Sequence, residues 1–185
     1  MQVISSLLQL QSGYLKDQED AEVFKECQIR IQSMALVHDR LYRSGNLATI
    51  DFGEHLRELT TLLARGQSDT HRNIEVAVKS SSIEVNLDNA IPLGLIAAEL
   101  VTNAYKHAFV GRDRGRIVVH LELSPARQLL LMVEDDGVGL SPAFDFDTAR
   151  SLGLRLIRSL TRQIRARLAL ESTAEGSKIS VSLSL

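Results

Sequence analysis

The sequence contains no tryptophan, a single cysteine and only three prolines among its 185 residues. Because Cys27 is alone, one chain can form neither a disulfide framework nor a cysteine-rich zinc site, which fits a reducing compartment. The sequence has no uninterrupted apolar run of about 18 residues and no signal-peptide pattern, so nothing predicts a membrane-spanning segment. We therefore expect a soluble, cytoplasmic chain.

A strong charge of one sign is also missing. The 23 acidic and 21 basic residues nearly cancel, leaving a net charge of −2. This balance supplies no basic field for nucleic acid and no polybasic tail for an anionic membrane, so neither is expected as a partner. A hydrophobic content of 44% is still enough for a sizeable core, and the length allows one domain or one domain with a small appendage.

Apolar spacing predicts two helices within residues 1–44. The first has a seam with 4-3-4 spacing, formed by Ile4, Leu8, Gln11 and Leu15. The second has a seam with 3-4-3-4-3 spacing, formed by Phe24, Cys27, Ile31, Met34, His38 and Leu41. Two such helices joined by a short turn form an antiparallel hairpin. Because one hairpin buries little surface, we expect it to dimerise into a four-helix bundle; the alternative is packing on the next domain of its own chain.

Residues 49–185 are expected to form a second domain, after a hairpin domain of residues 1–48. Helices are predicted at about 51–65, 92–109 and 152–164, and strands at 73–79, 83–85, 116–123, 128–134, 167–171 and 178–185. The strands arrive in pairs instead of alternating with helices, which favours an α+β fold with a mostly antiparallel mixed sheet over a doubly wound fold. Residues 141–150 lack periodicity and are expected to form a mobile loop.

The segment 99–109 is helical in pattern and mostly apolar, yet it carries four strongly polar side chains. At about 100° per residue these fall within an arc of roughly 100° on one face. They are Glu99, Asn103, Lys106 and His107. An acid, an amide, a cation and an imidazole on one stripe suit a magnesium ion and phosphate groups. The alternative is a solvated stripe on an amphipathic helix.

Two further segments are suited to ligand binding. Asp135-x-Gly137-x-Gly139 follows an apolar strand, where the carboxylate can accept from a ligand amino group and the glycines let backbone approach that ligand. The alternative is an ordinary Asp-Gly turn. Ser151 is a candidate N-cap, and the next residues, Leu152–Leu154, would offer free backbone N–H groups to phosphate at a helix N-terminus.

Four segments occur in a fixed order: E-L-V-T-N-A-Y-K-H-A-F, D-D-G-V-G-L, S-L-G-L-R-L-I and E-G-S-K-I-S-V. Together they resemble the asparagine and glycine boxes of the histidine-kinase-type ATP-binding (GHKL, Bergerat) fold, over residues from about 50 to 185. The segments M-Q-V-I-S-S-L-L-Q-L-Q and R-I-Q-S-M-A-L-V-H-D-R-L-Y resemble the dimerisation and phosphoacceptor region of bacterial sensor histidine kinases related to the HWE group. Without tryptophan, the chain resembles the sister subfamily and not the HWE kinases themselves.

The resemblance implies a Bergerat-type α/β sandwich that binds ATP and Mg²⁺. Asn103 would ligate a Mg²⁺ ion that bridges the phosphates, and Glu99 would help to hold that ion or its waters. Lys106 and His107 would approach the phosphates.

The resemblance also assigns the glycine segments. Asp135 would accept from the adenine amino group, next to a wall shaped by Gly137 and Gly139. The phosphates would meet the helix start at Leu152, Gly153 and Leu154, with Gly153 as the far hinge of a mobile lid. Gly176 and Ser177 would lie by the adenine. Arg150 and Arg155 are candidate phosphate contacts; the alternative for both is surface charge.

In the family, the phosphorylated histidine lies on the first helix, just before the residues that match Met1-Gln2-Val3, and the first helix here has no histidine. We therefore expect that the chain was cut or initiated inside this helix, or that the acceptor lies elsewhere, and that the chain does not autophosphorylate in the normal way. His38, followed by Asp39, is the alternative acceptor, although its seam position favours a structural role. The histidines without a motif around them are His55, His71 and His120.

The expected function is therefore the catalytic core of a two-component sensor histidine kinase. It would move the ATP γ-phosphoryl to a histidine and then to an aspartate of a response-regulator receiver domain. A longer parent protein would add an upstream sensor domain. The alternatives are a degenerate scaffold that docks a receiver without ATP and an ATPase of the same fold; an anti-sigma-type serine kinase shares the nucleotide site but not the hairpin.

Overall fold

The computed structural model describes residues 18–44, 48–66, 72–141 and 144–185. Its elements in chain order are α2 (Gln18–Ser44), β1 (Thr49–Asp51), α3 (Phe52–Gly66), β2 (Asn73–Ser80), β3 (Glu84–Asn86), α4 (Leu87–Asn103), the π-helix η1 (Ala104–Ala108), β4 (Arg114–Leu123), β5 (Gln128–Asp135), α5 (Leu152–Gln163), β6 (Arg167–Thr173) and β7 (Gly176–Ser184). Within these ranges no helix is both long enough and apolar enough to cross a bilayer.

A five-stranded sheet has the strand order β2-β4-β5-β7-β6. Only β2 and β4 run parallel, and the other neighbours are antiparallel. Strands β1 and β3 form a separate antiparallel pair. The predicted α+β fold with a mostly antiparallel mixed sheet is therefore confirmed.

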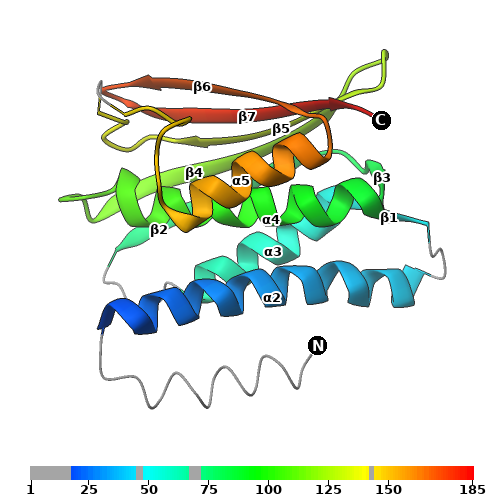
Figure 1. Ribbon diagram of the computed structural model, residues 1–185, viewed down its shortest axis with the longest axis horizontal. Helices are drawn as coiled ribbons and strands as arrows, with labels where there is room; N and C mark the ends of the chain where they lie inside the picture. Colours follow the sequence, from blue (N-terminus) through cyan, green and yellow to red (C-terminus); the bar gives the residue numbers. More distant parts are fainter. Residues whose placement is uncertain (1–17, 45–47, 67–71, 142–143) are drawn as a thin grey trace.

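The molecule is layered (Figure 1). Helices α3, α4 and α5 lie on one side of the large sheet, and α2 lies beyond them, farthest from the sheet. The core lies between the sheet and this helical layer, where its largest fully buried side chains include Phe52, Phe109, Leu56, Leu59, Leu93, Ile96, Leu129, Leu131 and Ile157. Helix α2 thus packs on α3 and α4 of its own chain. The first predicted helix lies in residues 1–17, outside the described residues.

Local signals explain most of these elements. Asp51 begins α3 as predicted, since its Oδ1 accepts from the backbone N–H of Glu54 at 3.0 Å. In β5 the burial alternates along the strand, so that Leu129, Leu131 and Val133 are buried on the face that packs against the helices. Asp135 continues this period and ends β5 on the same face. The alternation therefore directs a carboxylate into the space between sheet and helices.

The long central helix differs from its prediction at both ends. It begins at Leu87, because Asn86 caps it by accepting from the N–H of Asn89 at 3.0 Å, and Pro92 lies inside the helix and not in its first turn. After Asn103 the α-helix gives way to the π-helical turn η1. A π-helical turn is rare and is frequent at functional sites, and no residue pattern predicted this one.

Candidate functional site

A cavity of about 460 Å³ opens where α4, η1, β5, β7 and the start of α5 meet. It is lined by Leu100, Asn103, Ala104, His107, Ala108, Val133, Asp135, Gly139, Leu140, Phe144, Ala149, Arg150, Ser151, Leu154, Ser177 and Ile179. Apolar groups dominate, and a few polar groups from different elements point inward. This is the usual composition of a small-molecule pocket.

Asp135 supplies the buried acceptor of this cavity. Its side chain is 8% exposed, and its Oδ1 accepts from the backbone N–H of Gly137 at 3.0 Å. Its Oδ2 accepts from the hydroxyl of Ser177, which lies directly opposite on β7. The backbone N–H of Ser177 also donates to Oδ1, at 3.4 Å. Three donors therefore fix the orientation of the carboxylate, and a remaining lone pair on Oδ2 is available to a ligand donor.

Gly137 and Gly176 bring the backbone segments around Asp135 into contact. A Cβ on Gly137 would lie 2.2 Å from the carbonyl oxygen of Ala108, at the end of η1. Gly176 has a φ of +139°, and a Cβ there would lie 2.0 Å from the carbonyl oxygen of Asp135. These two predicted site glycines thus position the acceptor, whereas Gly139 lines the cavity itself.

The four residues of the predicted polar stripe have two different surroundings, the cavity and helix α2. Asn103 and His107 line the cavity, whereas Glu99 and Lys106 pair with α2. The division follows the helix geometry, because Glu99 and Lys106 lie on one edge of the predicted arc and the other two residues lie on the opposite edge. Within the stripe, Glu99 is buried, Asn103 and Lys106 are partly buried, and His107 is exposed.

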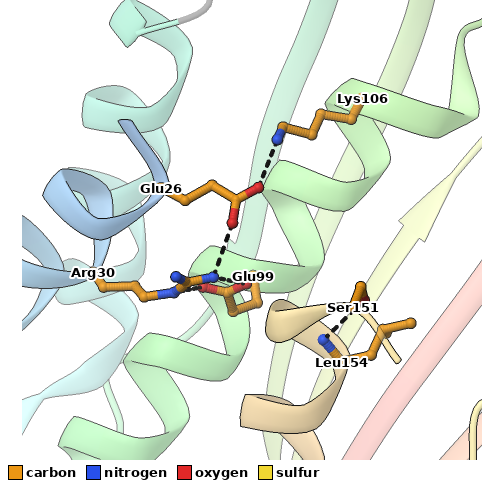
Figure 2. A network of polar contacts seen from close by, with 6 residues as sticks. All are labelled: Glu26, Arg30, Glu99, Lys106, Ser151 and Leu154. Atoms are coloured by element: carbon orange, nitrogen blue, oxygen red, sulfur yellow. Dashed lines mark hydrogen bonds and ion pairs between the residues drawn. The ribbon is translucent and has the colours of Figure 1, made fainter. Parts of the chain in front are cut away.

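Four side chains form an ion-pair network between α2 and the central helix, which consists of α4 and η1 (Figure 2). Arg30 contacts both oxygens of Glu99, with Nε at 2.6 Å from Oε1 and Nη2 at 3.1 Å from Oε2. Glu26 accepts from Arg30 Nη2 at 3.2 Å and from Lys106 Nζ at 2.7 Å. Arg30 and Glu99 are 8% and 7% exposed. We refer to Glu26, Arg30, Glu99 and Lys106 as the ion-pair network.

The network favours the charged forms of Glu26 and Arg30. Burial by itself raises the pKa of Glu26, but the hydrogen bonds and positive charges of Lys106 and Arg30 outweigh burial and keep the pKa below its ordinary value. Burial likewise opposes the charge on Arg30, and the hydrogen bond and negative charge of Glu99 outweigh it and raise the pKa of the guanidinium.

The N-terminus of α5 borders both the cavity and the network. Ser151 caps the helix as predicted, accepting from the N–H of Leu154 at 3.4 Å, and both residues line the cavity. A Cβ on Gly153 would lie 2.4 Å from Glu99 Oε2 and 3.9 Å from Arg30 Nη2. Gly153 therefore lets the first turn of α5 approach the ion-pair network, while Leu152 is exposed.

The segment 144–150, here called the lid segment, covers one side of the cavity. Arg158 of α5 donates to the carbonyl oxygens of Phe146 and of Ala149, the latter at 2.7 Å. Arg150, at the end of the lid segment, lines the cavity, whereas Arg155 is exposed and does not line it. Arg158 was missed by sequence reasoning, because no motif marks an arginine that binds backbone carbonyls.

Of the predicted site residues, the cavity brings together Asn103, His107, Asp135, Gly139, Leu154 and Ser177. Those that do not line it are Glu99, Lys106, Gly137, Leu152, Gly153 and Gly176. Sequence reasoning missed its apolar lining, including Leu100, Ala104, Val133 and Ile179. The strand members of this lining had a usable signal, because the period of two that buries Val133 also buries Asp135.

The side chains near the cavity determine whether it can hold a metal ion. Among the described residues no cluster of three or more His, Cys, Asp or Glu side chains is placed to hold one. Mg²⁺ in nucleotide sites uses one or two protein oxygens together with phosphate oxygens and water, so the Asn103 amide fits such a role. Glu99 fits it only without Arg30, which contacts both of its carboxylate oxygens.

The histidines occupy different environments. His38 is exposed on α2, and His120 of β4 lies 3.4 Å from a carboxylate oxygen of Glu134. His55 is fully buried in α3, which its sequence context did not predict. His71 lies outside the described residues.

Comparison with known proteins identifies the family. Residues 1–66 match a histidine kinase family, and residues 88–185 match the histidine kinase-, DNA gyrase B-, and HSP90-like ATPase family. The sensor histidine kinase PdtaS of Mycobacterium tuberculosis is 32% identical over 161 residues, covering 86% of this chain and 32% of PdtaS. The blue-light-activated histidine kinase 2 of Erythrobacter litoralis is 26% identical over 160 residues, covering 84% of this chain and 46% of that protein.

The chain thus spans less than half the length of these curated relatives. Among solved structures, the histidine kinase domain of the Erythrobacter litoralis EL346 blue-light-activated kinase has the same fold, with a TM-score of 0.81 at 23% identity, over all of this chain and 96% of that domain. The chain therefore belongs to the histidine kinase-, DNA gyrase B-, and HSP90-like ATPase family and carries a histidine kinase core.

Proposed function

We propose that this chain is the catalytic core of a two-component sensor histidine kinase. It binds Mg-ATP in the cavity and directs the γ-phosphoryl group to a histidine, from which the group passes to an aspartate of a response-regulator receiver domain. Curated relatives that match most of this chain are named as histidine kinases, PdtaS as a sensor histidine kinase, which supports the assignment. Hairpin residues 1–48 and ATP-binding residues 49–185 would be its two parts, with dimerisation through the hairpin.

The observation that carries this proposal is the oriented carboxylate of Asp135. It lies at the end of a cavity with mostly apolar walls, and Ser177 and Gly137 hold it in place. A flat heteroaromatic ring with an exocyclic amino group fits such a site, because the ring replaces water on the apolar walls and its N–H donates to the carboxylate. Adenine has this chemistry.

Other lining residues of the cavity suit the phosphates. Asn103 and His107 lie on the η1 side, and Ser151 and Leu154 lie at the N-terminus of α5, where free backbone N–H groups and the helix dipole favour anions. Bound magnesium would neutralise phosphate charge there, held by Asn103 and, once free of Arg30, by Glu99. Phosphoryl transfer needs this positioning and charge neutralisation more than it needs covalent chemistry by the protein.

Asp135→Asn tests the adenine contact with an isosteric change. We expect the affinity for adenosine and for Mg-ATP to fall by at least about tenfold, because the amide is a weaker, uncharged acceptor. Asp136→Asn is the matched control: its carboxylate accepts from the backbone N–H of Arg116 at 2.6 Å, is exposed and does not line the cavity. Equal affinities for wild type and Asp135→Asn, with unchanged melting temperatures, would remove the assignment.

A phosphorylation assay tests the expected lack of an acceptor. After incubation of the chain with γ-labelled ATP and Mg²⁺, we expect no acid-labile, base-stable label on the protein. Label that disappears in His38→Ala would instead make His38 the acceptor. Steady release of inorganic phosphate without any acceptor would favour the ATPase alternative.

A further inference from the structure

We propose that helix α2 controls access to the metal and phosphate end of the cavity, through competition between the ion-pair network and Mg-ATP. With Glu26 and Arg30 in place, Glu99 and Lys106 are engaged by α2; with Mg-ATP bound, α2 has released them. This inference rests on the proposed function, because it uses the roles of Glu99 and Lys106 at the nucleotide.

The contacts of Glu99 make the two states compete. Each carboxylate oxygen accepts from a different nitrogen of Arg30, at 2.6 and 3.1 Å. A metal ion and a guanidinium are both cations, so they repel each other at the same carboxylate. Because the pair is buried, water screens this repulsion little. Metal coordination by Glu99 therefore competes with the contact to Arg30.

The contacts of Lys106 imply the same kind of competition, here between Glu26 of α2 and a negatively charged phosphate. Its ammonium lies 2.7 Å from Glu26 Oε1. A nucleotide phosphate that approached Lys106 would compete with this carboxylate and would be repelled by it. Cation and anion of the nucleotide complex thus each meet a like-charged rival supplied by α2: Arg30 for magnesium and Glu26 for phosphate.

The position of Arg30 beside the N-terminus of α5 supports this competition. The guanidinium of Arg30 lies beside Gly153, in the first turn of α5, which is the turn expected to bind phosphate. Figure 2 shows the network between α2 and the central helix, with the Ser151 cap next to it. Farther along α2, Arg40 pairs with Glu54 and Glu58 of α3, away from the cavity. The Arg40 attachment of α2 thus lies away from the nucleotide end, unlike the ion-pair network.

The test measures the affinities of Mg-ATP and of adenosine for the whole chain. Arg30→Met keeps the apolar stem but frees Glu99, so we expect Mg-ATP to bind about tenfold tighter while adenosine binding stays constant. Glu26→Gln removes the carboxylate that pairs with Lys106 and repels phosphate, so a smaller gain of the same sign is expected. Arg40→Met is the matched control, because it removes the other charged attachment of α2 and should leave both affinities unchanged.

Hydrogen exchange provides a second readout. In the wild-type chain, Mg-ATP should accelerate exchange in a peptide spanning Glu26 and Arg30, and adenosine should not, because linkage between the two equilibria is reciprocal. Unchanged or weaker Mg-ATP binding by Arg30→Met and Glu26→Gln, an equal gain in Arg40→Met, or protection of this peptide by Mg-ATP would each overturn the competition. Loss of adenosine and ATP binding in every protein, wild type included, would instead overturn the proposed function.

Discussion

Acid should destabilise the folded chain through a single buried imidazole. His55 of α3 is 0% exposed, its ring centroid lies 5.4 Å from that of Phe52, and neither ring nitrogen has a hydrogen-bond partner among the described residues. Burial, followed by the positive charge of Arg40, lowers the pKa of His55 from 6.5 to about 4. The folded state therefore keeps this imidazole neutral over a range of pH in which the unfolded chain protonates it.

The sign and size of the effect follow from proton linkage. Between pH 6.5 and pH 4 the unfolded state binds one more proton than the folded state, so the free energy of unfolding falls as the pH falls. Integrated from pH 7.5 to pH 4.5, this one group removes about 2.5 kcal/mol of stability. A loss of that size is a large fraction of the stability of a typical domain.

Urea unfolding at several pH values measures the effect, with His55→Leu as the variant that removes the titration and keeps an apolar side chain in the core. The wild-type chain should lose about 2.5 kcal/mol more than His55→Leu between pH 7.5 and pH 4.5. Carboxylates with lowered pKa values, such as Glu26 and Asp51, act at lower pH and are common to both proteins. Parallel pH profiles for the two proteins would refute the reasoning.

Three further changes have specific expected outcomes. Asn103→Ala should weaken Mg-ATP binding by about tenfold or more in calorimetric titrations and leave adenosine binding unchanged, because the amide lies at the phosphate end. Arg158→Met removes the donors to two lid carbonyls, so exchange of amides in 144–150 should accelerate on the order of tenfold. Gly176→Ala, where a Cβ would meet a backbone carbonyl at 2.0 Å, should lower stability by more than about 2 kcal/mol in thermal melts; Gly111→Ala, with a φ of +74° but open space, should lose only about 1 kcal/mol.

The sequence predicted the sheet and the acceptor end of the cavity because both depend on local patterns. A period of two along β5 determines that Asp135 shares the buried face of Val133, and the pairing of β5 with β7 then places Ser177 opposite it. The helical period likewise placed Asn103 and His107 together. The burial of Asp135 needs only the neighbours along one strand, whereas the place of Ser177 depends on pairing between two strands.

Other features depend on contacts between distant parts of the chain. Arg30 and Glu99 are 69 positions apart, and nothing in the seam pattern of α2 marks Arg30 as buried. That seam was assigned to Phe24, Cys27, Ile31 and their repeats, whereas the described face of α2 with the lowest exposure carries Arg30, Ser33 and Val37. Heptad reasoning assumes an apolar partner, and the surface that α2 meets here is apolar at Val37 but charged at Arg30.

Stability alone does not account for a buried Arg30–Glu99 pair. Removing two ions from water is costly, and apolar residues of similar volume at both positions would be about as stabilising or more so. An apolar pair, however, would have no affinity for a cation or a phosphate, so it would keep α2 in place whether or not nucleotide is present. Charged partners stabilise the docked helix. The same groups, the carboxylate of Glu99 and the ammonium of Lys106, can also contact Mg-ATP. The position of α2 can depend on Mg-ATP if the helix has two arrangements of similar free energy. These two arrangements differ in the cation that Glu99 contacts, Arg30 in one and magnesium in the other.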